Sequence, residues 1–224
     1  MRRYIAFVLP FVFVLGAMAQ PQRGVSKRDK KFPVSGAQLD FVLPSAFNNT
    51  QMRHLTEVIG QLGLNVQFPL YKGLGIGGGV RASFFDYDQR SFQGNARTGS
   101  VQRWSYYGKV QWEVLTSEKT FIELGARFGT TSYAFRTDSL GTHTSQGSYF
   151  SPAFGWYLMA TKNLAFGLVI GYEADGVYLV PEQFALTALP NRRVGETEGP
   201  IRYFTLGLSV SARFRKGEEP VDYY

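Results

Sequence analysis

Apolar and polar residues alternate along most of the chain after residue 36. Between Leu62 and Phe68 every second residue is Leu, Val or Phe, and the residues between them are Gly, Asn and Gln. The stretch from Phe204 to Phe214 has Phe, Leu, Val and Ala on one side and Thr, Gly, Ser and Arg on the other. A period of two indicates β-strands with one apolar and one polar face. The pattern predicts eight strands, at about residues 37–43, 54–68, 74–86, 102–115, 120–135, 149–160, 164–178 and 201–215.

The connections between the predicted strands alternate in length. Those after the second, fourth and sixth strands are short turns, whereas those after the first, third, fifth and seventh have about ten, fifteen, thirteen and more than twenty residues. In an up-and-down barrel every second connection lies at the same end, and membrane barrels have short turns at one end and long loops at the other. We therefore predict an all-β fold, an eight-stranded antiparallel up-and-down transmembrane β-barrel.

Composition agrees with a membrane barrel. Aromatic residues make up 16% of the chain, and they gather near the ends of the predicted strands, as Trp112 and Trp156 do near short turns and Trp104 and Tyr149 near long loops. Belts of aromatic residues mark the two membrane interfaces of such barrels. The chain has 25 glycines, which suit a thin inner wall, and no cysteine, which excludes disulfides and thiolate chemistry.

The N-terminus has the features of a secretory signal peptide. Arg2 and Arg3 precede an apolar run, and the small residues Ala17 and Ala19 stand at the −3 and −1 positions of a cleavage site. We expect a signal peptide at residues 1–19, a basic periplasmic segment at 20–36, the outer-membrane β-barrel at 37–215 and a short C-terminal tail at 216–224. No later apolar run is long enough for a transmembrane helix.

The predicted strands together resemble the small eight-stranded outer-membrane β-barrel proteins of diderm bacteria, the outer membrane protein A, X and W types. The resemblance covers Ala37 to Arg215 and is one of architecture. It implies export to the cell outer membrane and contact with outer-membrane lipid and lipopolysaccharide. It also implies that the barrel-insertion machinery reads a terminal aromatic residue, which is Phe214 or Tyr224 here. We expect no nucleic-acid partner.

The polar face carries charges that an eight-stranded barrel would enclose. Four acids and four bases occupy it: Asp40, Glu113, Glu123 and Glu173 with Arg81, Lys109, Arg127 and Arg213. A barrel of this size is filled by its own side chains, and buried charges must be paired. We expect the register of the fourth and fifth strands to bring Glu113 near Glu123 and Lys109 near Arg127. Arg213 is then predicted to neutralise Glu113 and Glu123, and Glu173 to reach Arg127.

The last long loop, residues 180–200, has the most function-like composition. Its candidate binding residues are apolar or basic: Phe184, Leu186, Leu189, Arg192 and Arg193. The loop either folds over the barrel mouth as a lid or docks a partner protein from the envelope, and the arginines suit lipopolysaccharide phosphates. The sequence leaves both interpretations open.

These features favour a non-enzymatic outer-membrane barrel with a charge-filled lumen. It would act as a structural element, or as a binding platform through its extracellular loops, including as an accessory of an envelope or secretion complex. With two histidines and no cysteine in the chain, we expect no metal site and no cofactor.

Two alternatives remain. His143-Thr144-Ser145 resembles the histidine-x-serine pair of the lipid A deacylase barrels, which would imply a lipid-modifying enzyme, although residues 140–147 are predicted to be a loop and Gln146 stands where that family has asparagine. The other alternative is a secreted lipocalin-like barrel, in which the apolar face would surround a ligand. A period of two alone does not decide which face is inside.

Overall fold

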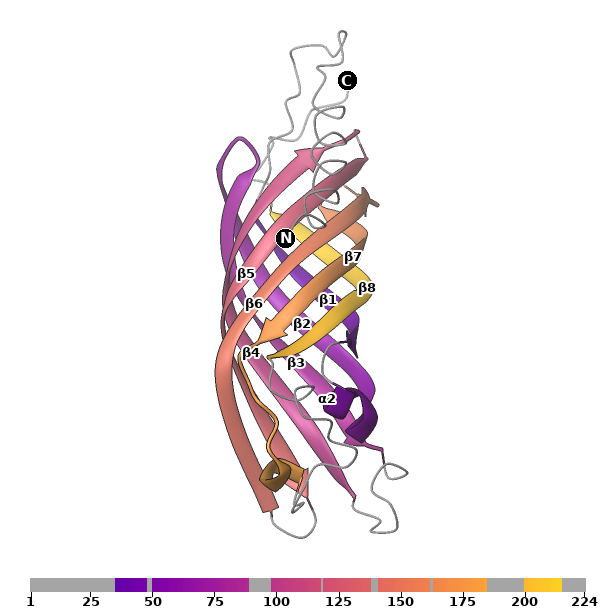
Figure 1. Cartoon of the computed structure of the whole chain (residues 1–224). Helices are drawn as coiled ribbons and strands as arrows, with labels where there is room; N and C mark the ends of the chain where they lie inside the picture. Colours follow the sequence, from indigo (N-terminus) through magenta and orange to yellow (C-terminus); the bar gives the residue numbers. More distant parts are fainter. Residues whose placement is uncertain are drawn as a thin grey trace, which may run out of the picture. The chain divides into compact units, whose positions relative to one another are not determined.

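The computed structural model describes residues 35–47, 50–88, 98–117, 119–137, 141–161, 163–184 and 200–214. Eight antiparallel strands form one closed barrel, in which each strand pairs with its neighbours in the chain and β1 pairs with β8 (Figure 1). The strands are β1 (Ser35–Ala46), β2 (Thr56–Tyr71), β3 (Leu74–Tyr87), β4 (Gly99–Leu115), β5 (Thr120–Thr137), β6 (Gly141–Met159), β7 (Leu164–Asp175) and β8 (Ile201–Phe214). The predicted fold is confirmed. The predicted signal peptide, most of the basic segment and the C-terminal tail lie outside the described residues.

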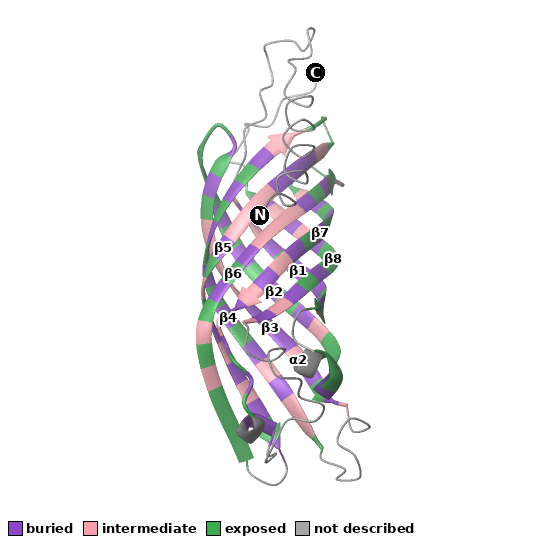
Figure 2. Ribbon diagram, in the orientation of Figure 1, coloured by how far each residue is buried: buried purple, intermediate pink, exposed green. Residues whose placement is uncertain are grey.

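Burial alternates along the strands with the same period of two as the sequence (Figure 2). On β2, Leu62 and Leu64 are 45% and 53% exposed, whereas the polar residues on either side of them, Gln61 and Asn65, face inward and are 3% and 1% exposed. The polar face is therefore the inside of the barrel and the apolar face is the outside. This arrangement contradicts the lipocalin-like alternative, in which the apolar side chains would point inward.

Short turns close one end of the barrel, which we call the turn end. Between β2 and β3, Lys72 and Gly73 both have positive φ, 42° and 94°, as the tightest hairpin turns require. The opposite end, the loop end, carries the helix α2 (Thr50–Leu55) after β1 and the short 3-10 helix η2 (Pro181–Phe184) after β7. Within the described residues, no helix is long and apolar enough to cross a membrane.

Three predicted boundaries at the loop end are wrong. The connection after the fifth strand is not a loop of about thirteen residues, because β5 runs to Thr137 and pairs with β6 as far as Gly141. The start predicted for the second strand, at residue 54, belongs to α2. β7 ends at Asp175, not at residue 178. For the β5–β6 hairpin the physical reason is that a strand beyond the apolar belt no longer needs one apolar face, so its period of two disappears from the sequence. At β7 the opposite holds, because the alternation of buried and exposed residues continues after the strand has ended at Asp175.

Candidate functional site

The inner face of the barrel carries the charged residues predicted for the lumen. Asp40 on β1 and Glu173 on β7 have no exposed surface. The other six are at most 5% exposed: Arg81 on β3, Lys109 and Glu113 on β4, Glu123 and Arg127 on β5, and Arg213 on β8. Charged groups with so little access to water need partners of opposite charge and hydrogen bonds.

Asp40 is held by two arginines in the middle of the lumen. Its Oδ2 accepts hydrogen bonds from Nη2 of Arg81 and Nη2 of Arg127, each at 3.1 Å. Its Oδ1 accepts one from the hydroxyl of Ser209 at 2.8 Å. Both carboxylate oxygens are thus engaged, and side chains from β1, β3, β5 and β8 meet at one point.

Glu173 joins this centre to a second layer nearer the loop end. Its Oε1 accepts hydrogen bonds from Arg81 and, at 2.9 Å, from Gln61, and its Oε2 accepts one from Nη1 of Arg103 at 2.5 Å. The prediction that Glu173 reaches Arg127 is wrong. Arg127 pairs with Asp40 instead, while Arg81 and Arg103 pair with Glu173.

Arg103 and Asp175 belong to the network and were missed in the sequence. Both are fully buried, and Nε and Nη2 of Arg103 contact the two carboxylate oxygens of Asp175 at 2.8 and 2.9 Å. Their positions carried a signal, because Arg103 is in phase with Lys109 and Asp175 follows Glu173 by two residues. They lie toward the ends of the predicted strands, outside the mid-strand positions from which the lumen charges were taken.

A separate set of charges fills the turn end of the lumen. Glu113 faces Glu123 and Lys109 faces Arg127 in the β4–β5 register, as predicted, so like charges lie side by side. Arg213 comes across the lumen to Oε1 of Glu113 at 2.5 Å. Glu123 does not pair with Arg213 as expected, because Lys109 on the neighbouring strand already contacts it at 2.7 Å.

An aromatic ring and two glycines close the space around these charges. The ring of Tyr157 stacks on that of Phe121, with centroids 4.7 Å apart and planes at 4°. A Cβ atom at Gly155 would lie 2.5 Å from a ring carbon of Tyr157, and one at Gly167 would collide with the same ring. Glycine at these wall positions makes room for a ring that fills the lumen.

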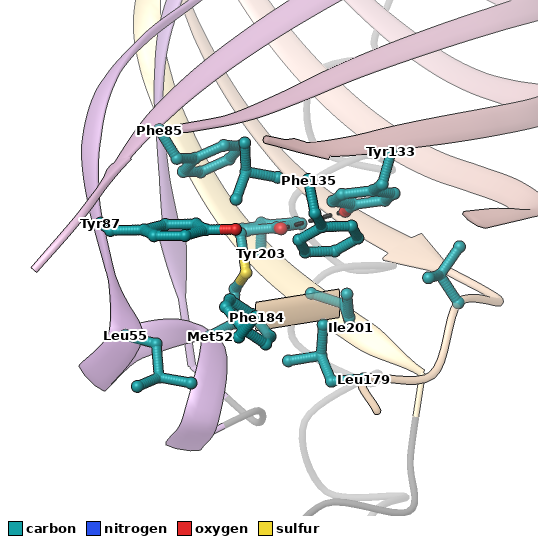
Figure 3. Packing of buried hydrophobic residues seen from close by; sticks show 12 residues of the cluster. Met52, Leu55, Phe85, Tyr87, Tyr133, Phe135, Leu179, Phe184, Ile201 and Tyr203 are labelled. Atoms are coloured by element: carbon teal, nitrogen blue, oxygen red, sulfur yellow. Dashed lines mark hydrogen bonds between the residues drawn. The ribbon is translucent and has the colours of Figure 1, made fainter. Parts of the chain in front are cut away.

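Buried apolar side chains pack together at the loop end of the barrel and form an apolar cap (Figure 3). Its members are buried side chains from α2, β3, β4, β5, β8 and the segment after β7: Met52, Leu55, Phe85, Tyr87, Val101, Tyr133, Phe135, Val177, Leu179, Phe184, Ile201 and Tyr203. Tyr133 connects the cap to the charges below, because its hydroxyl donates to Asp175 and lies 3.0 Å from that of Tyr203. Among the described residues, the apolar cap and the paired charges together fill successive layers of the lumen.

Phe184, a predicted binding residue, belongs to this cap. It is fully buried, and its ring centroid lies 5.5 Å from that of Tyr87 and 5.2 Å from that of Phe135. Gln183 beside it donates through Nε2 to Oγ of Ser145 at 2.7 Å, which ties η2 to β6. The other predicted binding residues of this loop lie outside the described residues: Leu186, Leu189, Arg192 and Arg193.

The candidate histidine–serine pair lies on β6 and not in a loop. His143 and Ser145 face Phe135 and Tyr133 across the β5–β6 pairing, and they share one side of the strand. The hydroxyl of Ser145 is engaged by Gln183. Among the described residues, no group of three or more His, Asp or Glu side chains is arranged to hold a metal ion.

The outer surface of the barrel is a belt of exposed apolar side chains. Leu64, Phe166 and Leu208 in its middle are 53%, 49% and 60% exposed. Half-exposed aromatic side chains border it, Trp112 and Trp156 toward the turn end and Trp104, Tyr106 and Phe150 toward the loop end. A closed apolar belt with aromatic borders is the surface that a transmembrane barrel turns to lipid.

Comparison with known proteins gives a likeness of fold without a likeness of sequence. No family model and no curated protein matches the chain. Neisserial surface protein A matches with a TM-score of 0.53 at 11% identity, over 80% of this chain and 97% of that one. Ail of Yersinia pestis matches with 0.44 at 10% identity over 82% and 99%, and the outer membrane protease OmpT of Escherichia coli with 0.39 at 8% over 84% and 100%. The closed barrel and its apolar belt thus give this chain the fold of the small eight-stranded outer-membrane β-barrels.

Proposed function

We propose that the protein is a closed, non-enzymatic outer-membrane barrel that serves as a binding platform through its extracellular end. The proposal rests on one observation: the five buried acids and five buried bases of the described residues pair with one another inside the lumen, beneath an apolar cap. A lumen filled in this way gives a solute no passage and a substrate no access. Function then belongs to the loop end, which faces outward in barrels of this type.

The β5–β6 hairpin is the part of that end best suited to contact a partner. β6 pairs with β5 as far as Gly141 but with β7 only from Tyr149, so eight residues extend past β7. Thr142, Thr144 and Gln146 are exposed on the outer side of this extension. Uncharged hydroxyl and amide groups on a paired strand offer hydrogen bonds from a rigid support, which suits another envelope protein or a secretion component.

A photo-reactive amino acid tests the platform in native membranes. We expect position Thr144 to give a cross-linked protein adduct of defined mass, and position Arg192 to give the same adduct if the last loop shares the site. Phe166, half-exposed in the lipid-facing belt, is the matched control and should give lipid adducts only. Lipid adducts alone at Thr144 and Arg192 would contradict the platform.

A lipid-modifying enzyme is the second candidate, and the placement of His143 and Ser145 favours it. The two residues stand two apart on one side of a strand, as the resemblance to the deacylase barrels requires. The hydrogen bond from Gln183 to the Ser145 hydroxyl speaks for a structural role instead. We therefore expect Ser145→Ala to leave lipid A unchanged by mass spectrometry. If lipid A of the wild-type strain lacked an acyl chain that lipid A of the Ser145→Ala strain retains, the enzyme would be established.

A further inference from the structure

Pro152 interrupts the pairing of β6 with β7 in the wall of the barrel. The two strands pair at Phe150 with Ala174 and again at Ala153 with Gly171, in the same register, but the pairing skips Ser151 and Pro152. On its other side β6 stays paired with β5 through this point. The interruption is therefore local and belongs to a single seam of the barrel.

The missing donor can be assigned to one carbonyl group. The amide of Gly176 on the β7 side donates to the carbonyl of Ser148 at 2.8 Å, so the backbone groups of Ser148 point toward β7. Residues two apart in an antiparallel strand point the same way, so Pro152 also points toward β7. The shared register sets Tyr172 opposite Pro152. Because proline has no amide hydrogen, β6 offers no donor to the carbonyl of Tyr172.

An apolar groove of about 540 Å³ lies on the outer wall at this seam. Its lining includes Pro152, Phe154 and Tyr172, together with Ala126 and Trp112 from the neighbouring strands. Tyr172 is three residues from the loop end of β7, and its ring lies 5.8 Å from that of Phe47. The groove therefore crosses the lipid-facing belt from Trp112, toward the turn end, to Tyr172, toward the loop end and the outer leaflet. At Tyr172 it opens to lipid, where no water is at hand to satisfy a backbone carbonyl.

We propose that this groove binds an outer-leaflet lipid whose acyl chain carries a hydroxyl group. The chain fills the apolar groove, and its hydroxyl donates the hydrogen bond that Pro152 withholds from the carbonyl of Tyr172. An unsubstituted chain fills the same space but leaves the carbonyl unpaired, so the site distinguishes the two chemistries. The groove thus selects an apolar chain that carries one hydrogen-bond donor.

Lipid retention by the folded barrel tests the site. The probes are two phosphatidylethanolamines that differ only in one chain, 3-hydroxytetradecanoyl or tetradecanoyl, and retention in detergent is read by native mass spectrometry. We expect the wild type to retain the hydroxylated lipid roughly two- to tenfold better, the range that one net hydrogen bond gives. Pro152→Ala supplies the missing amide, so the preference should vanish while the plain lipid is still retained. Ala126→Phe fills the groove and should lower retention of both lipids.

Pro44→Ala is the matched control, because it removes a strand proline elsewhere in the same barrel. The amide of Phe47 donates to Arg202, so odd-numbered residues of β1 point toward β8 and Pro44 points toward β2, where the β1–β2 pairing has already ended. This variant should keep the lipid preference. Equal retention of the two lipids by the wild type would overturn the proposal. A preference that survives Pro152→Ala, or one that Pro44→Ala removes, would overturn it equally.

Discussion

The second charged layer, nearer the loop end, depends on Arg103. Its guanidinium contacts Glu173 at 2.5 Å and Asp175 at 2.8 Å, and it lies within 6 Å of the ring centroids of Tyr133, Tyr149 and Tyr203. Removing one partner of a buried ion pair leaves an uncompensated charge, which costs more than the pair itself contributes. Replacing Arg103 should therefore destabilise the barrel.

Arg103→Met is expected to lower the free energy of unfolding by about 3–5 kcal/mol, because two carboxylates lose their shared partner. Urea unfolding of the barrel in lipid vesicles, followed by tryptophan fluorescence, measures the change. Arg136→Met is the control: Arg136 is exposed near the end of β5, and its loss should change the free energy by about 0.5 kcal/mol or less.

The double variant Arg103→Met with Asp175→Asn keeps this prediction testable if the single variant folds poorly. Because it removes one charge of each sign, it should lose less stability than the sum of the two single changes. Strictly additive losses would mean that the pair is not coupled, and the network interpretation would then be wrong at this layer.

The identity of the inward-facing charges follows from the sequence, but most of their partners do not. Period-two phase places Asp40 or Arg81 on one face without any structure. Partners such as Arg127 and Asp40 lie on strands far apart in the chain, and their approach depends on barrel radius and strand stagger. Arg213 with Glu113 was predictable because both lie near the turn end, where chain position fixes height in the barrel.

At the scale of elements, the strands in the membrane were predictable and the loop end was not. Inside the apolar belt each strand has lipid on one side and the polar lumen on the other, so apolar and polar residues alternate in the sequence. The outer part of the β5–β6 hairpin does not face lipid on one side. Its residues 142–148 therefore show no alternation of apolar and polar positions, and the sequence of this paired strand resembles that of a loop. The short turns were found because their residues are fixed by backbone geometry.

The two short helices at the loop end show the same limit. α2 is six residues long and η2 four, which is too short for a helical period to be recognised in a sequence. Both helices are held by contacts with distant parts of the chain: Met52 and Leu55 pack into the apolar cap, and Gln183 donates a hydrogen bond to Ser145. Packing of this kind is decided by tertiary structure alone.

At the scale of the whole molecule, the described side chains fill the lumen in three layers. Arg213 with Glu113 and Lys109 with Glu123 fill the turn end, the centre is held by Asp40 and Glu173, and the apolar cap closes the loop end. Among the residues that the structure describes, buried acids and bases are equal in number, so their charges balance without counter-ions from solution. Under the proposed function, the barrel wall is a support, and binding belongs to the loop end and the outer surface.

Single-channel recording from the purified barrel in planar lipid bilayers tests this central claim most directly. The closed lumen predicts no conductance steps above the bare bilayer at neutral pH and ordinary salt, at protein amounts for which a porin control opens many channels. Steady, reproducible conductance steps from the folded, heat-modifiable form would contradict a sealed lumen and the binding-platform function inferred from it.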